Sequence, residues 1–120
     1  AKNLFIRDDK KQHYYLLTVQ RNKRVDLKAF RKAQQTRPLT FASSEELLDK
    51  LRLPPGAVTP LGLLNRDVHE VTAYFDEELL TGSGLVGVHP NENTATVWLK
   101  TADLIQLLRE HGCEVIVTRL

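Results

Sequence analysis

Residues 3–19, NLFIRDDKKQHYYLLTV, contain two apolar segments on either side of a charged turn. Residues 3–7 predict one strand and residues 13–19 predict a second. Between them Asp8-Asp9-Lys10-Lys11 forms a polar turn, so we expect the two strands to pair as a hairpin. The start of the chain therefore predicts the beginning of a β-sheet.

Helix and strand patterns alternate along the rest of the chain. Asp26 is placed to N-cap a helix that runs to about residue 35, and Pro38 prevents its continuation. Ser43 and Glu46 form a capping-box pattern for a second helix, which is expected to stop before residues 54–56. Short strands are expected over residues 61–64, 71–75, 85–89, 94–99 and 114–118, with a helical turn over 76–80 and a last helix that Thr101 caps and Gly112 ends.

Strands outnumber helices in this pattern, and several are linked as hairpins. We therefore expect an α/β protein of the α+β type, with a mixed, mostly antiparallel sheet and helices packed on it. The 120 residues are the size of one domain. No internal repeat or linker divides them, so a single domain over residues 1–120 is expected.

Composition excludes several classes of protein. The apolar share of 42% and the charged share of 27% are typical of a soluble globular protein. No apolar run approaches the roughly 18 residues of a membrane span, and no signal peptide is present, so we expect a cytoplasmic protein. The single cysteine, Cys113, rules out an internal disulfide framework, and we expect it to be a small buried residue.

Metal and cofactor chemistry is not expected either. The four histidines show no metal-ligand spacing: they are His13, His69, His89 and His111. The chain also has no Walker A loop, no G-x-G-x-x-G motif, no H-E-x-x-H motif and no G-x-S-x-G elbow. We therefore expect neither a metal nor a cofactor.

The charge is unevenly distributed along the chain. Residues 1–37 carry eleven Lys and Arg against three Asp, whereas residues 38–120 carry six against twelve Asp and Glu. Lys28, Arg31 and Lys32 fall at i, i+3 and i+4, so one turn of helix presents three cations together. This asymmetry indicates a polyanionic partner; the alternative is a solvated basic helix and hairpin.

Three segments carry residues suited to a small-molecule site. Lys2-Asn3 places a cation at the start of an apolar strand, where it could hold a phosphate or a carbonyl oxygen. Residues 56–60 combine a glycine that lets backbone approach a ligand with a proline that stiffens the loop. Residues 88–94 form a polar cluster around His89 that suits the rim of a pocket. The structural alternatives are an exposed strand end, a loop before a strand and a hairpin turn.

Together, four elements in order resemble one family: Lys2-Asn3-Leu4-Phe5, Arg24-Val25-Asp26-Leu27-Lys28, Gly56-x-Val58-Thr59-Pro60-x-Gly62-Leu63-x-Asn65 and His89-Pro90-x-x-Asn93-Thr94-Ala95-Thr96. The chain is similar to the YbaK / prolyl-tRNA synthetase-associated editing domains, most of all to their freestanding Ala-tRNA(Pro) deacylases. The resemblance runs from Lys2 to Leu120. Family members carry a further N-terminal segment that helps wall the pocket, and the 120 residues lack it.

The resemblance implies a hydrolase that serves translation fidelity by cleaving the ester of Ala-tRNA(Pro). It implies that Lys2 matches the essential lysine, that Asn3 contacts the substrate, and that His89 lies in the pocket and helps set amino-acid size. It further implies that Gly56, Ala57, Val58, Thr59 and Pro60 form the substrate-binding loop. The family lacks a protein nucleophile; water is activated with help from a ribose hydroxyl of the tRNA.

The partners that this implies are the acceptor end of tRNA(Pro) and prolyl-tRNA synthetase, with no membrane and no metal. The basic surface with Lys28, Arg31 and Lys32 would contact acceptor-stem phosphates. Three alternatives stay open: a deacylase for Cys-tRNA(Pro) or another small amino acid, a noncatalytic RNA- or partner-binding relative, and an insertion domain of a prolyl-tRNA synthetase. The ending at Leu120, shortly after a strand, favours the freestanding form.

Overall fold

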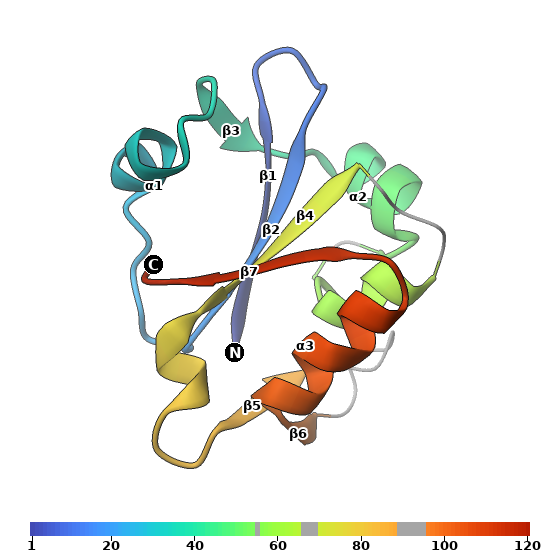
Figure 1. Ribbon diagram of the computed structural model, residues 1–120. Coiled ribbons are helices and arrows are strands. Elements are labelled where there is room, and N and C mark those ends of the chain that lie inside the picture. The colour runs from blue at the N-terminus through green and yellow to red at the C-terminus, as the bar shows by residue number, and fades with distance from the viewer. Residues whose placement is uncertain (55, 66–69, 89–95) are drawn as a thin grey trace.

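The structure is a computed structural model that describes residues 1–54, 56–65, 70–88 and 96–120. Its main sheet has five strands in the order β3-β1-β2-β4-β7 (Figure 1). The strands are β1 (Lys2–Asp8), β2 (Tyr14–Val19), β3 (Leu39–Phe41), β4 (Val71–Asp76) and β7 (Glu114–Thr118). β1 pairs antiparallel with β2 and β3, whereas β2, β4 and β7 run parallel. The expected mixed sheet and the hairpin over residues 3–19 are confirmed.

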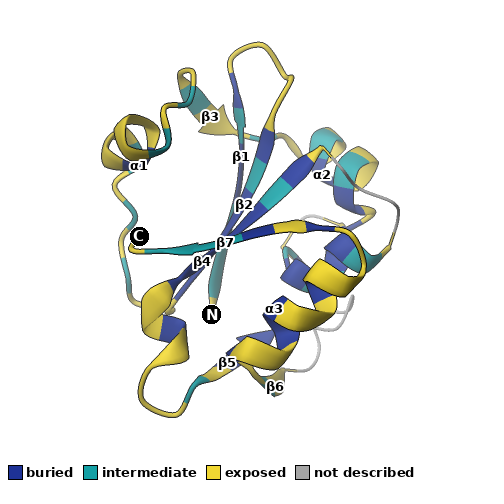
Figure 2. Ribbon diagram, in the orientation of Figure 1, coloured by how far each residue is buried: buried dark blue, intermediate teal, exposed yellow. Residues whose placement is uncertain are grey.

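A smaller antiparallel sheet is formed by β5 (Leu85–Val88) and β6 (Val97–Lys100). Three α-helices accompany the sheets: α1 (Leu27–Gln34), α2 (Ser44–Leu51) and α3 (Thr101–Glu110). α1 lies on one side of the main sheet, and α2 and α3 lie on the other (Figure 1). Figure 2 shows that buried residues are concentrated in the central strands and on the inner side of α3.

The two faces of the main sheet bury separate apolar clusters. Phe30 of α1 packs with Ile6, Leu17 and Tyr74 on one face. The larger cluster on the opposite face combines Phe5 and other residues of the sheet with residues of α2, α3 and β5. Alternate residues of β1 therefore face different layers, as the period of two in a strand requires.

Local capping signals predicted two of the helices well. The Asp26 side chain accepts hydrogen bonds from Lys28 N and Ala29 N at the start of α1. Ser43 and Glu46 form both bonds of a capping box at the start of α2. These side chains satisfy backbone N–H groups that a helix start otherwise leaves without partners.

Two predicted features are wrong. Residues 61–64 are not a strand, because Pro60–Leu64 forms a 3₁₀ helix, η1, whose N-cap Thr59 accepts a hydrogen bond from Leu61 N. A proline suits the first position of such a turn because its φ is fixed and it needs no N–H partner. Thr101 does not cap α3: it is the first helical residue, and its Oγ1 donates to Leu79 O in the short 3₁₀ helix η2 (Glu77–Leu80).

Candidate active site

The first residues of β1 join segments that lie far apart in the sequence. Asn3 Nδ2 donates to Val58 O at 3.1 Å, which ties the strand to the 56–60 loop. The Ala1 nitrogen donates to Gly87 O in β5 at 3.2 Å. Lys2 is therefore flanked by Ala1, which is bound to β5, and by Asn3, which is bound to the 56–60 loop. In the sequence, β5 directly precedes His89. The Lys2 strand and the 56–60 loop, predicted from sequence as parts of one site, meet at this end of β1.

Asn3 uses its side chain to hold this arrangement. Its Oδ1 accepts a hydrogen bond of 2.7 Å from Thr18 Oγ1, and Thr18 is the cross-strand partner of Asn3. Thr18 is buried, so its hydroxyl needs that acceptor. The Asn3 carboxamide thus fixes the position of the 56–60 loop relative to the hairpin. An amide nitrogen carries two hydrogens, so one donor of Asn3 remains for a ligand.

The 56–60 loop turns most of its side chains inward. Ala57, Thr59 and Pro60 are buried, whereas Gly56 is exposed and Val58 is half-buried. Gly56 has a φ of +83°, in the left-handed region that favours glycine. The loop therefore has a defined shape, set by the Thr59 cap, by Pro60 and by the conformation of Gly56.

A cavity of about 230 Å³ lies between this loop and the start of α2. Three predicted site residues line it, namely Asn3, Gly56 and Val58. The rest of its wall comes from Leu4, Phe5, Phe41, Ala42, Ser43, Ser44 and Leu47. This volume lies below the roughly 300–1,000 Å³ of pockets for drug-sized ligands, so it suits a small group such as an amino-acid side chain.

Lys2 does not line this cavity. Asn3 faces the 56–60 loop, so strand alternation directs the preceding side chain toward the other face, where Leu4 packs. Lys2 is half-buried and forms no ion pair with any residue that the structure describes. His89 lies outside the described ranges. The structure thus brings together Asn3, Gly56 and Val58, and it places Lys2 beside them in the chain with its side chain directed away.

A polar cluster that the sequence did not predict supports one wall of the cavity. Glu46 of α2 accepts a 2.7 Å hydrogen bond from Tyr14 OH and pairs with Arg7 Nε at 2.8 Å. It also accepts from Ser43 N. Burial alone would raise the pKa of Glu46, but hydrogen bonds from Tyr14, Ser43 and Arg7 outweigh it and lower that pKa to about 2.

The same contacts change the pKa of the Tyr14 phenol. Burial, together with the neighbouring Glu46 carboxylate, raises the pKa of Tyr14 to about 12. Glu46 therefore stays ionised and Tyr14 stays neutral at neutral pH. This cluster binds α2 to the β1–β2 hairpin and so fixes Ser43, which lines the cavity.

The three predicted tRNA-contacting cations lie elsewhere. Lys28, Arg31 and Lys32 are exposed on α1, and together they line a shallow depression of about 540 Å³ with Gln35 and Thr36. None of the three forms an ion pair with a described residue. They form a basic surface, which we call the α1 patch, on the sheet face opposite the 56–60 loop (Figure 1).

The structure also bears on membranes, metals and the cysteine. Within the described ranges no helix is long and apolar enough to cross a membrane. Those same residues contain no group of three or more His, Cys, Asp or Glu side chains that could hold a metal ion. Cys113 is buried, as expected.

Comparison with known proteins identifies one family. The model of the aminoacyl-tRNA editing domain matches residues 1–107, and the chain belongs to this family. It is 40% identical over 112 residues to the prolyl-tRNA editing protein ProX of Acetoanaerobium sticklandii, covering 93% of this chain and 68% of that protein. It is 36% identical over 111 residues to prolyl-tRNA synthetase associated domain-containing protein 1 of Danio rerio, covering 92% of this chain and 60% of that one.

A solved structure extends the similarity to the fold. It is a protein assigned, provisionally, as a trans-editing enzyme for prolyl tRNA synthetase. The TM-score is 0.72 at 26% sequence identity, and the match covers 97% of this chain and 67% of that one. The family expected from the sequence motifs is therefore confirmed.

Gly56 offers a first test of the loop. An added Cβ would meet no atom within 4 Å, so Gly56→Ala is strained by its positive φ and not by a clash. We expect it to lose about 1 kcal/mol of stability, and to lower kcat/KM further because the methyl group enters the cavity. Gly84→Ala is the matched control, since Gly84 also has a positive φ, +67°, and ordinary space around it. Equal losses of activity at matched stability would reduce Gly56 to a structural turn.

Proposed function

We propose that this protein hydrolyses mischarged aminoacyl-tRNA in trans, with Ala-tRNA(Pro) as substrate and alanine and free tRNA as products. The observation that carries the proposal is the junction at the start of β1. There the bonds from Asn3 to Val58 and from Ala1 to Gly87 bring the Lys2 segment to the 56–60 loop and to β5. Membership of the aminoacyl-tRNA editing family and 40% identity to ProX support it.

The reaction needs little covalent chemistry from the protein. A water oxygen attacks the ester carbonyl, the bond to the terminal ribose oxygen breaks, and that oxygen takes a proton as the amino acid leaves. Backbone amides of the 56–60 loop would orient the aminoacyl group. The Lys2 side chain starts from the other face of β1, so it would have to turn round the strand end for its ammonium to stabilise the negative charge that develops on the substrate. A neighbouring ribose hydroxyl of the tRNA would help to activate the water.

Amino-acid selection would come from the size of the site. A pocket discriminates one methylene by only about 1–3 kcal/mol, so a synthetase that accepts proline also admits alanine. A second site that is too small for proline separates the two. The cavity of about 230 Å³ beside Asn3 and Gly56 could hold the alanine side chain, but its volume alone would also admit proline, so further residues must narrow it. His89 would limit the same space from the segment that follows β5. Asn3 would act as a positioning residue that also offers one free N–H to the substrate.

A comparison of three substrates tests this proposal. The protein is incubated with Ala-tRNA(Pro), Cys-tRNA(Pro) and Pro-tRNA(Pro), and release of each amino acid is followed against spontaneous hydrolysis. Alanine should leave fastest and proline should not leave above background. Preferential release of cysteine would assign the site to the other small substrate, and the absence of release from all three would contradict a deacylase.

The partners follow from the same reaction. We propose that the α1 patch contacts the phosphates of the tRNA acceptor arm. The α1 patch and the 56–60 loop lie on opposite faces of the main sheet, so the arm would have to pass an edge of the sheet to contact both. The protein would act beside prolyl-tRNA synthetase, in the cytoplasm, as one domain over residues 1–120.

Charge reversal of the α1 patch tests this interaction. Changing Lys28, Arg31 and Lys32 to Glu should weaken tRNA binding strongly and lower its salt slope by about one unit for each phosphate that is no longer bound. The maximal rate at saturating tRNA should change little, because these residues lie away from the ester. Reversal of Arg52 and Arg119, two exposed cations outside this surface, is the control. Filter binding over a salt series would reject the patch if the triple variant kept the affinity and slope of the parent.

A further inference from the structure

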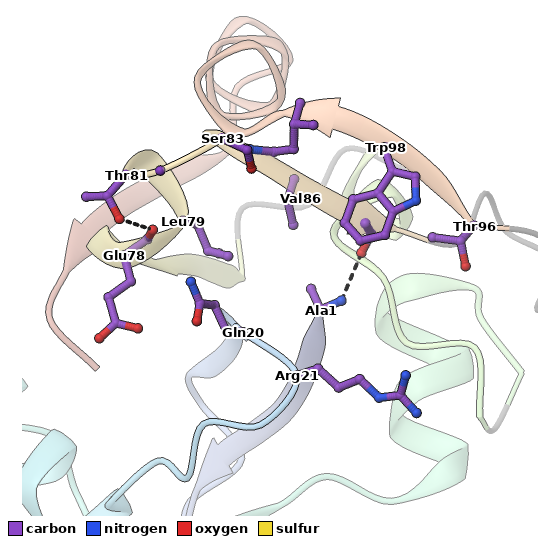
Figure 3. A pocket seen from close by; sticks show the side chains of 13 residues that line it. Ala1, Gln20, Arg21, Glu78, Leu79, Thr81, Ser83, Val86, Thr96 and Trp98 are labelled. Carbon is purple, nitrogen blue, oxygen red and sulfur yellow. Dashed lines mark hydrogen bonds between the residues drawn. The ribbon is translucent and has the colours of Figure 1, made fainter.

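A second cavity, of about 730 Å³, adjoins the start of β1. Ala1, Gln20 and Arg21 line one side of it, and Ser83 and Trp98 line the other (Figure 3). Gly87 is also part of the lining. Its volume is within the range of sites that bind small molecules. Ala1 and Gly87, which are joined by a hydrogen bond in the junction described above, both line this cavity.

Trp98 gives the cavity a flat aromatic wall. The residue is 65% exposed, which is unusual for so large an apolar side chain. It lies opposite Gly87 in the β5–β6 register, and a Cβ at Gly87 would lie 3.1 Å from the indole ring. The absence of a side chain at Gly87 therefore lets the ring lie against β5 on one side while most of it stays open.

Arg21 offers the cavity a cation that could bind an anionic group. Arg21 is exposed and forms no ion pair with a described residue, and Figure 3 shows Ala1 between Arg21 and Trp98. The carboxylate of Glu78 also lines the cavity, but Lys23 Nζ lies 3.2 Å from it. Lys23 is shared with the buried Asp76, whose Oδ2 lies closer to it at 2.5 Å, so it offsets the charge of Glu78 only in part. The positive charge of Arg21 is available to a ligand.

We infer that this cavity binds the 3′-terminal nucleotide of the tRNA, with the adenine stacked on Trp98 and a backbone phosphate paired with Arg21. The inference rests on the proposed function. The scissile ester is attached to the terminal ribose, so the terminal base must lie within one nucleotide of the reacting carbonyl. A base on Trp98 would set the ribose beside Ala1 and direct the ester toward the Lys2 segment. Aromatic stacking and one cation are the elements that single-stranded nucleic acid sites use.

Truncation of Trp98 tests the stacking interaction in the deacylation assay. Trp98→Ala should raise KM for Ala-tRNA(Pro) about 10-fold or more, with kcat at saturating tRNA nearly unchanged. Trp98→Phe should restore most of the affinity because it keeps a stacking ring. Leu48→Ala is the control for removal of an exposed apolar side chain, since Leu48 is 57% exposed on α2, and it should leave KM unchanged.

Fluorescence offers a direct reading, because Trp98 is the single tryptophan of the 120 residues. The protein is titrated with AMP, with CMP, and with deacylated tRNA(Pro) that either carries or lacks its terminal adenosine. AMP and the intact tRNA should quench the emission, whereas CMP and the shortened tRNA should quench it much less. Arg21→Glu should weaken quenching by AMP.

Two results would overturn the inference. One is an unchanged KM in Trp98→Ala together with equal quenching by the two tRNA forms. The other is an emission change that depends on protein concentration and not on nucleotide, which would assign Trp98 to an interface between two copies of the chain. Either could occur in a protein that still deacylates Ala-tRNA(Pro), so the proposed function would survive. Quenching that requires the terminal adenosine, in a protein that releases no amino acid, would uphold the subsite and contradict the deacylase.

Discussion

Replacing Lys2 with alanine is expected to lower kcat for Ala-tRNA(Pro) by about 100- to 1,000-fold, the usual cost of removing one group that stabilises an oxyanion. The fold should persist, because Lys2 is half-buried at a strand end and forms no ion pair with a described residue. Stability should therefore change by no more than about 0.5 kcal/mol. Single-turnover release of alanine measures the chemical step apart from binding.

Two further variants sharpen this test. Lys10→Ala removes an exposed lysine from the hairpin turn that follows β1, and it should retain the parental rate. Lys2→Arg keeps the charge and should recover part of the activity if charge is what matters. Turnover by Lys2→Ala equal to that of Lys10→Ala, at matched circular dichroism, would remove Lys2 from the site. The side chain would then be the solvated strand end that its direction in β1 also permits.

Removing the Glu46 carboxylate is expected to give the largest loss of stability, about 2–4 kcal/mol for Glu46→Ala. The change leaves Arg7 and Tyr14 OH without their partner and breaks the capping box of α2. Glu45→Ala, at the adjacent exposed position, is the control and should cost little. Urea unfolding monitored by circular dichroism gives both values, and equal losses for the two variants would contradict a stabilising cluster.

The same cluster predicts how stability depends on pH. The folded pKa of Glu46 is about 2 against an ordinary 4.5, so its contribution is complete above pH 4.5 and is lost as the pH falls toward 2. A shift of this size corresponds to at most about 3 kcal/mol. Tyr14 affects stability at high pH. Its pKa of about 12 exceeds the ordinary 10, so its contribution to stability is complete below pH 10 and declines as the pH rises toward 12. Glu46→Gln should flatten the acid limb, and an unchanged acid limb in that variant would assign it to other carboxyl groups.

Local signals in the sequence predicted much of this fold. The hairpin and the caps at Asp26 and Ser43 are specified by neighbouring residues, and β7 has the predicted bounds. β3 was not predicted, since its three residues form a strand only by pairing with the edge of β1. The apolar residues 61–64 fit a strand or a helical turn equally well. The N-cap at Thr59 and the proline at the first position favour the helical turn that the structure shows.

The candidate site was predictable in its segments and not in its contacts. The Lys2 strand and the 56–60 loop are recognisable as motifs, yet the tie between Asn3 and Val58 joins residues 55 positions apart. The pairing of Arg7 with Glu46 spans 39 positions, and the sequence around Glu46 indicates only its local capping box. Such contacts depend on how the strands are ordered in the sheet, which periodicity does not specify. The role of Gly87 beneath Trp98 depends on the β5–β6 register in the same way.

The aminoacyl ester is expected to bind at the start of β1, between the 56–60 loop and β5. Amide chemical-shift mapping with a hydrolysis-resistant analogue, alanine joined by an amide bond to 3′-amino-adenosine, tests this placement most directly. We expect saturable shifts centred on Asn3, Gly56, Val58 and Gly87, with the amides of α1 unaffected. Shifts confined to α1, or none near Asn3 and Gly56 at saturation, would contradict it.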